Sequence, residues 1–154
     1  MVNIKLICVG KIKEKYLDDA INEYVKRLKT LCTFQIVEIK EINSSDYKKD
    51  LIEEGKNILK NINENDYVIT LEIDGKELSS VDFSKLIESH YTYDNKKMIF
   101  VIGSSCGLSD EVKSRSNYKL SFSKMTFPHQ LMRVIYLEQL YRAFAIINNI
   151  KYHK

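Results

Sequence analysis

Short apolar runs and longer amphipathic segments alternate along the whole chain, and this order of elements limits the fold to one class. The runs are rich in β-branched residues and end at turn residues, so they predict strands at residues 3–9, 33–39, 67–73, 98–102 and 119–122. Between them, apolar residues at helical spacing or a capping residue predict helices at about 16–28, 51–62, 79–90, shortly after 109, and 128–148. The alternation predicts one α/β domain over residues 1–154, with a mostly parallel sheet and helices on both faces.

Single residues mark several of these boundaries. Asp74-Gly75 is a turn dipeptide and is expected to close the third strand. Ser79 begins a capping-box pattern, and Ser109 is suited to cap the short helix after it. Pro128 fits the first turn of the last helix, where the missing N–H of proline costs nothing.

The formal net charge of +3 hides an uneven distribution of charge along the chain. Residues 1–112 carry 16 basic and 20 acidic side chains, a net of −4. Residues 113–154 carry eight basic side chains against the single acid Glu138, a net of +7. The total excludes a strongly basic nucleic-acid protein, whereas the asymmetry favours an anionic partner for the C-terminal part. A solvated basic face would give the same pattern and stays open at this point.

The three cysteines and three histidines show no metal-ligand spacing, so no metal site is expected. An odd number of cysteines and the lack of an N-terminal apolar segment are typical of a reduced, cytoplasmic protein. Cys8 lies in an apolar strand and is expected to be a core residue. No apolar run approaches the roughly 18 residues that a membrane span requires, so no membrane partner is expected.

Three segments are expected to meet at the carboxyl edge of the sheet, where open α/β folds bind their ligands. They are residues 71–75, 103–107 and 122–127. The second follows an apolar strand directly and contains Gly103 and Gly107, whose backbone can approach a ligand closely. It matches neither a dinucleotide fingerprint nor a P-loop, and such a loop often serves only as a turn.

The last helix is apolar on more than one face, which predicts burial on two sides. One side is expected to pack on the sheet and the other on a second subunit, with a helix central to the monomer as the alternative. The tail that follows gathers an aromatic ring, a titrating imidazole and a cation in Tyr152, His153 and Lys154. This set can stack on a base, move a proton and hold phosphate, although a frayed chain end is the alternative. Glu138 and Arg142, spaced i,i+4, could be a simple surface pair.

Three stretches of the C-terminal part carry a specific pattern: SFSKMTFPHQLMRV at 121–134, EQLYRAF at 138–144 and YHK at 152–154. Together with VGK at 9–11, TLEI at 70–73 and VIG at 101–103, they resemble the ribosomal large subunit methyltransferase H family over essentially the whole chain. The resemblance implies a SPOUT-class fold, with a trefoil knot and cofactor region at about 98–154, an exception to the rule that chains are unknotted. It also implies S-adenosylmethionine as cofactor, a homodimer, and methylation of N3 of a pseudouridine in a 23S rRNA hairpin of the assembled ribosome.

The resemblance places the cofactor-binding residues within the three segments named above. They are Leu71, Gly103, Phe122, Ser123, Lys124, Met125, Thr126 and Phe127. One departure is Ser104, where the family usually has a second glycine. If that position needs a positive φ, serine is unfavourable there, which would affect the conformation of the loop and the affinity for the cofactor.

The resemblance also assigns roles in the reaction. His153 is the candidate general base or proton relay, since an ordinary imidazole titrates near neutral pH. Tyr152 would stack on or orient the target base, and Arg142 and Lys154 would hold phosphate or stabilise charge on the uracil carbonyls. The tail of one subunit would complete the site of the other. Arg133 and His129 are further substrate-binding candidates. His129 is also an alternative to His153 for proton transfer, although it is better suited to ordering the loop before the last helix.

Three other interpretations stay open from the sequence. The chain could be a methyltransferase of the same class with another RNA target, or a ribosome-binding module that has lost the cofactor through Ser104. A flavodoxin-like nucleotide binder is disfavoured by the poor match to phosphate-loop motifs.

Overall fold

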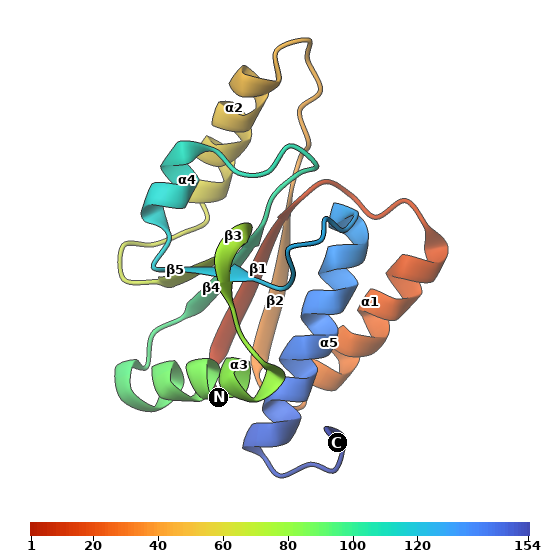
Figure 1. The fold of residues 1–154 in the computed structure, drawn as a ribbon, viewed down its shortest axis with the longest axis vertical. Coiled ribbons are helices and arrows are strands. Elements are labelled where there is room, and N and C mark those ends of the chain that lie inside the picture. The colour runs from red at the N-terminus through yellow and green to blue at the C-terminus, as the bar shows by residue number, and fades with distance from the viewer.

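The computed structural model describes the backbone of residues 1–154 and the side chains of residues 1–92 and 95–154. Five strands form one parallel sheet in the order β2-β1-β4-β3-β5 (Figure 1). They are β1 (Asn3–Val9), β2 (Thr33–Ile39), β3 (Tyr67–Glu77), β4 (Met98–Ile102) and β5 (Tyr118–Ser121). The helices between and after them are α1 (Lys15–Leu28), α2 (Tyr47–Leu59), α3 (Ser80–Ser89) with a π-helical turn η1 (His90–Asp94), α4 (Asp110–Arg115) and α5 (His129–Ile147). The predicted α/β class is therefore confirmed.

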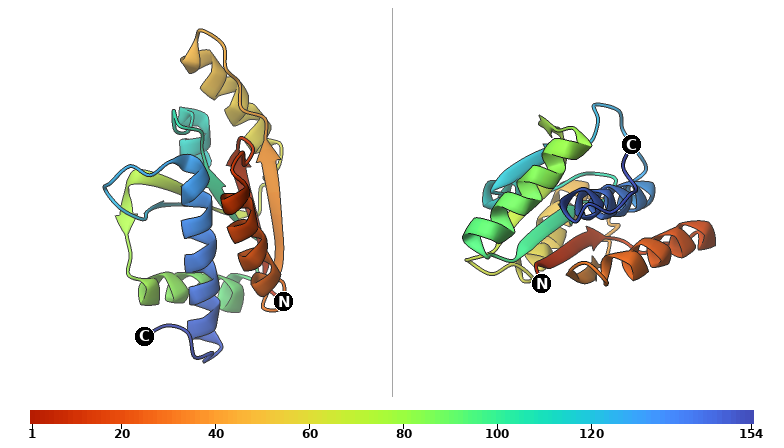
Figure 2. Two further views of the ribbon diagram at one scale, coloured as in Figure 1. Left: turned by 90° about the vertical axis from the view of Figure 1, so that its right-hand side faces the viewer. Right: turned by 90° about the horizontal axis from the view of Figure 1, so that it is seen from below.

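Helices cover both faces of the sheet, as the sequence predicts. Helices α1, α3 and α5 lie on one face, and α2 and α4 lie on the other (Figures 1 and 2). The alternation of side chains along β1 explains the two layers, because Leu6 and Cys8 join the first core and Ile7 and Val9 join the second. Strand β4 is buried along its whole length, which is typical of a central parallel strand. Cys8 is a core residue, as expected.

Helix α5 packs on the sheet between α1 and α3 (Figure 1). Its side chains Tyr136, Leu140 and Phe144 are buried in the core on that side. A stripe on the outward side stays partly open, with Leu131 37% exposed and Ile135 half-buried. Neighbours within the chain thus account for much of the apolar surface of α5, and the outward stripe stays partly exposed in the single chain.

The capping predictions are confirmed at two helices. The Ser79 side chain accepts a hydrogen bond from the Asp82 amide at 3.0 Å, and Ser109 does the same for Val112 at 3.3 Å. Pro128 is one position earlier than expected, since it is the N-cap residue of α5.

The predicted end of the third strand is wrong. Strand β3 continues through Asp74-Gly75 to Glu77, because its far end pairs with β5 after a register shift between Leu71 and Lys76. Gly75 has a packing role in this arrangement: a Cβ on it would lie 2.7 Å from the carbonyl carbon of Lys119. The trefoil knot expected for residues 98–154 stays a prediction.

Candidate cofactor cleft and C-terminal cluster

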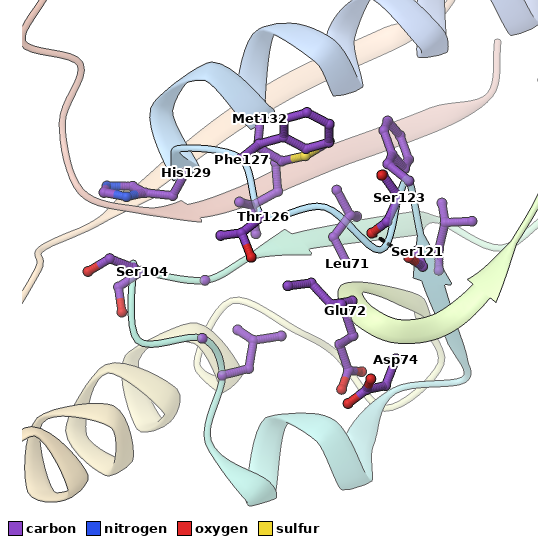
Figure 3. Close-up of a pocket in the computed structure, with 18 of the residues that line it drawn as sticks. Leu71, Glu72, Asp74, Ser104, Ser121, Ser123, Thr126, Phe127, His129 and Met132 are labelled. Carbon is purple, nitrogen blue, oxygen red and sulfur yellow. Dashed lines mark hydrogen bonds between the residues drawn. The ribbon is translucent and has the colours of Figure 1, made fainter.

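A cleft of about 310 Å³ lies at the carboxyl ends of β4 and β5 and against residues 71–74 in the middle of β3 (Figure 3). All three segments that the sequence directs to this edge of the sheet contribute to its lining. Seven of the eight predicted cofactor residues line the cleft: Leu71, Gly103, Phe122, Ser123, Met125, Thr126 and Phe127. Lys124 does not line it and is exposed to solvent.

The loop after β4 is tightly folded. Its Gly107 amide donates to the Ser104 carbonyl at 2.9 Å, and the two residues form an isolated β-bridge. Gly107 has φ of 91°, which glycine adopts without strain. Gly103 is in contact with it, since a Cβ on Gly103 would lie 2.7 Å from the Gly107 carbonyl carbon. Glycine is therefore required at 103 by close packing and at 107 by the backbone conformation.

Ser104 does not have the conformation that would make serine unfavourable. The non-glycine residues with positive φ are Asn95 and Asn149, so the backbone at Ser104 lies in an ordinary region. The departure from the family pattern at this position therefore carries no backbone strain.

The loop between β5 and α5 is held by its own side chains. The Ser121 hydroxyl donates to the Ser123 carbonyl at 3.0 Å, and the Met125 amide donates to the Ser123 hydroxyl oxygen at 3.0 Å. Phe122 packs edge-on against Phe83 of α3, with ring centroids 6.1 Å apart. Met125 is 74% exposed at the rim of the cleft. The loop is thus ordered locally while it presents apolar side chains to the cleft.

The lining combines apolar walls with charged groups at the rim. Leu71, Leu120 and Phe127 contribute apolar surface, whereas Glu72, Asp74 and Lys113 contribute charge. The carboxylates of Glu72 and Asp74 lie near one another in Figure 3. Sequence reasoning selected the segment 71–75 without assigning a role to Glu72 or Asp74, and it missed Lys113. Carboxylates accept hydrogen bonds from hydroxyl or ammonium groups, so the cleft suits a ligand with a flat apolar part and polar ends.

The chain end is folded back on α5 rather than frayed. Helix α5 ends in a Schellman motif, in which the Ile150 amide donates to Ala145 at 2.8 Å and Asn149 adopts φ of 55°. The Tyr152 hydroxyl then donates to the Glu138 carboxylate at 3.0 Å. Asparagine adopts the left-handed backbone conformation at little cost in free energy. Asn149, at the end of α5, thereby directs the tail back toward the helix.

The three candidate catalytic residues Tyr152, His153 and Arg142 lie together in the structure, and Glu138 joins them. Their roles in the reaction stay predictions. The Arg142 guanidinium forms an ion pair with Glu138, stacks 4.8 Å from the Tyr152 ring centroid, and lies 3.1 Å from Nδ1 of His153. We call Glu138, Arg142, Tyr152 and His153 the C-terminal cluster. The Glu138–Arg142 pair is thus part of a larger network instead of an isolated surface pair.

Electrostatics fix the charge states of two members of the C-terminal cluster. Burial, together with hydrogen bonds to Tyr24 and Glu138, raises the pKa of Tyr152 to about 12, so its phenol stays neutral. The hydrogen bond to Glu138 raises the pKa of Arg142 further. A guanidinium can only donate, so Nδ1 of His153 is the acceptor in this contact, and a neutral imidazole carries its proton on Nε2.

The cleft and the C-terminal cluster lie at opposite ends of α5. His129 at the start of the helix lines the cleft, and the chain ends beyond the other end (Figures 1 and 2). His129 and Arg142 are separated by about 20 Å along the helix axis, at 1.5 Å per residue. The C-terminal cluster therefore does not reach the cleft of its own chain.

The remaining candidates differ in exposure. Lys154 is exposed. His129 has its Nε2 atom buried without a hydrogen-bond partner among the described residues. Arg133 is 2% exposed; its guanidinium pairs with Glu38 at 2.8 Å and donates to the Gly10 carbonyl at 3.1 Å. This burial favours a role for Arg133 in fixing α5 to the edge of the sheet.

A family model described as "Predicted SPOUT methyltransferase" matches residues 2–153. The chain belongs to the SPOUT methyltransferase family. It is 52% identical to the ribosomal RNA large subunit methyltransferase H of Clostridium botulinum strain Kyoto, over 99% of this chain and 100% of that protein. It is 50% identical, with the same coverage, to the protein of that name from Clostridium acetobutylicum.

A solved structure of a probable methyltransferase from Bordetella pertussis Tohama I has the same fold as this SPOUT methyltransferase. The TM-score is 0.61 at 9% identity, covering 93% of this chain and 96% of that one. Among the described residues, no three His, Cys, Asp or Glu side chains form a group that could hold a metal ion. In the same part of the chain, no helix is long and apolar enough to cross a membrane.

Proposed function

We propose that this SPOUT methyltransferase uses S-adenosylmethionine to methylate N3 of a pseudouridine in 23S rRNA, on assembled ribosomes and as a homodimer. The observation that carries the proposal is the cleft, which gathers seven of the eight residues expected to hold the cofactor. The two Clostridium relatives are 52% and 50% identical to this chain over 99% of its length. Their names support rRNA as the substrate class.

The chemistry of its lining suits the cleft to S-adenosylmethionine. No side chain blocks the approach to Gly107, since a Cβ there would meet nothing within 4 Å. Leu71 and Phe127 would contact the adenine ring, and Glu72 and Asp74 would accept hydrogen bonds from its polar substituents. The cofactor supplies a methyl group activated on a sulfonium, so the main task of the protein is to position the target nitrogen in line with it.

The C-terminal cluster would act on the RNA from the second subunit. Because about 20 Å separates it from the cleft along α5, only a partner chain can bring Tyr152 and His153 to a ligand in that cleft. The partly exposed stripe of α5 with Leu131 and Ile135 is suited to the contact between subunits.

The target nitrogen must lose its proton, and His153 is the candidate acceptor. Its Nδ1 lone pair is used by Arg142 in the structure, so the imidazole can accept a proton only after that contact is released. An arriving phosphate or uracil carbonyl would compete for the Arg142 guanidinium and thereby release Nδ1. Substrate binding and activation of the base would then be the same event.

Transfer of tritiated methyl groups to assembled ribosomes, free 23S rRNA and tRNA tests the proposal. We expect transfer to ribosomes, and mass mapping should locate one methyl group on a pseudouridine of 23S rRNA. Transfer to tRNA instead would refute the substrate. A failure of millimolar S-adenosylmethionine to give heat in calorimetry would favour a ribosome-binding module without catalysis.

A further inference from the structure

A row of aromatic rings and guanidinium groups joins α1 to the C-terminal cluster. The guanidinium carbon of Arg27 lies 5.3 Å from the ring centroid of Tyr24 and 5.4 Å from that of Tyr141. The two rings are 6.4 Å apart, measured between centroids, and are tilted by 49°. Both tyrosines are half-buried and pack against the core on this side of the sheet. Arg27 therefore links α1 to α5 through two cation–π contacts, on rings that the core holds in place.

The row continues from Tyr141 to the chain end. The rings of Tyr141 and Tyr152 are 4.9 Å apart at an interplanar angle of 79°, the edge-to-face arrangement that aromatic pairs prefer. The Arg142 guanidinium lies 4.8 Å from the centroid of the Tyr152 ring, and the Tyr152 hydroxyl donates to Glu138 at 3.0 Å. Tyr152 is thus held through its ring by two side chains of α5 and through its hydroxyl by a third.

These contacts determine where His153 lies. The residue follows Tyr152 directly, is exposed, and has its Nδ1 atom 3.1 Å from the Arg142 guanidinium. A chain end without secondary structure has high conformational entropy, so it stays in one place only where side chains hold it. Arg142 is itself stacked on Tyr152, so the imidazole depends on the Tyr152 ring both through the backbone and through this guanidinium. The side chains that fix the Tyr152 ring therefore also fix the candidate base.

We propose that Tyr141 is a positioning residue, which is supported by Tyr24 and Arg27 of α1 and holds Tyr152, so that His153 is in place before RNA binds. The inference rests on the proposed function for the role of His153 in proton transfer, whereas the placement of the tail is a property of each single chain. The proposed function assigns no role to Tyr24, Arg27 or Tyr141. Helix α1 thereby contributes to the reaction without touching the substrate.

The charge of Arg27 can be separated from its stacking. Arg27 also forms an ion pair with Glu23, one turn earlier on α1, at 3.8 Å. The two side chains are 41% and 51% exposed, and exposed ion pairs contribute little to stability. Lysine keeps the charge but lacks the flat guanidinium that stacks on rings. Arg27→Lys therefore removes the stacking alone, and Glu23→Gln removes the ion pair while leaving both rings in contact with Arg27.

Substitutions at two tyrosines give a matched set. Tyr141→Leu removes the ring that contacts Tyr152 and keeps a good helix former in α5. Tyr141→Phe keeps the ring, which makes all the contacts described above, and should behave as the wild type. Tyr16→Leu is the control, because it removes the same kind of ring from α1 at a position that is 70% exposed. If Tyr141→Leu is unstable, the partly exposed Arg27 still allows the row to be tested from the surface of α1.

Two measurements test the proposal: NMR order parameters of the backbone at residues 151–153 without RNA, and the rate of methyl transfer at saturating S-adenosylmethionine and ribosomes. Tyr141→Leu should lower the order parameters from about 0.85, the value of rigid backbone, to about 0.6 or less. It should slow methyl transfer about tenfold, the upper range for loss of an aromatic pair. Arg27→Lys should slow transfer about threefold, and Glu23→Gln and Tyr16→Leu should leave it unchanged. The calorimetric affinity for S-adenosylmethionine should stay as in the wild type, because none of these residues lines the cleft.

Two results would overturn the proposal. The first is a set of wild-type order parameters in both Tyr141→Leu and Arg27→Lys, which would mean that the row of rings does not hold the tail. The second is a mobile tail with an unchanged rate of methyl transfer, which would mean that the reaction does not use its placement. The order parameters are measured without RNA. If the wild type transfers no methyl group to rRNA, the proposed function fails, while the order parameters still decide whether Tyr141 holds the tail.

Discussion

Mixing two inactive variants should restore activity if the site is shared between subunits. The first variant, Gly103→Ala, distorts the loop after β4 that lines the cleft, because the added Cβ would lie 2.7 Å from the Gly107 carbonyl carbon. The second, His153→Ala, removes the candidate base from the C-terminal cluster. Each homodimer should retain at most a few per cent of the activity, because each carries the same defect in both of its sites.

The expected recovery follows from the geometry of α5. About 20 Å along the helix separates the cleft from the C-terminal cluster of the same chain, so in the proposed dimer each site would combine the cleft of one subunit with the tail of the other. In a heterodimer of the two variants, one site then has both defects and the other has neither. Random reassortment gives about half heterodimers, so methyl transfer should recover to about one quarter of the wild-type rate.

The assay is methyl transfer to ribosomes after joint unfolding and refolding, with heterodimers counted by native mass spectrometry. A chain with both substitutions, mixed equally with wild type, is the control. A shared site predicts about one quarter of the wild-type rate, and a site within one chain predicts about one half. Two results together would refute a site shared between subunits. They are heterodimers that are verified by mass spectrometry but show no recovery of methyl transfer, and a control mixture with one half of the wild-type rate.

Other consequences of the structure can be measured on the isolated protein. Gly55→Ala should lower the free energy of unfolding in urea by about 1–3 kcal/mol, although alanine is the better helix former, because the new Cβ meets Ser109. Of the three thiols, Cys106 is exposed and should react with a disulfide reagent in the native state, whereas Cys8 and Cys32 should react only after unfolding. Burial raises the pKa of Cys8 from 9.0 to about 12, so the unfolded chain releases this proton first. Stability should therefore be full below pH 9 and fall toward pH 12, by at most about 1.4 kcal/mol per pH unit from this thiol, and Cys8→Val should reduce the slope.

The sequence predicts the elements whose formation depends on local signals. Strand β4 occupies the predicted residues Met98–Ile102, since an all-apolar run that ends at glycine leaves few alternatives. Ser79 and Ser109 cap their helices because a cap needs only the next three residues. The cleft was predictable to the same extent, because parallel strands bring their carboxyl ends to one edge whatever the details of the loops.

Features that depend on distant partners were missed. The turn signal at Asp74-Gly75 is overruled by pairing of β3 with β5, some 45 residues later in the chain. Glu54 has the appearance of a solvated helix residue in the sequence, but it is 3% exposed in the structure, and its carboxylate accepts a hydrogen bond from the Ile42 amide in the preceding loop. No local pattern contains information of that kind, so such residues emerge only from the packed structure.

The structure also changes how the basic C-terminal part can serve RNA binding. Of its eight cations, Arg133 is buried against Glu38, Arg142 pairs with Glu138, and Arg115 donates to main-chain carbonyls of Asn63 and Asp66. The three arginines are thus engaged within the protein. The charge that reaches solvent or the cleft comes from lysines: Lys113, Lys119, Lys124, Lys151 and Lys154. Five point charges are few for holding a folded RNA, whose affinity for a protein grows with the number of phosphates neutralised. The proposed dimer would double this cationic surface.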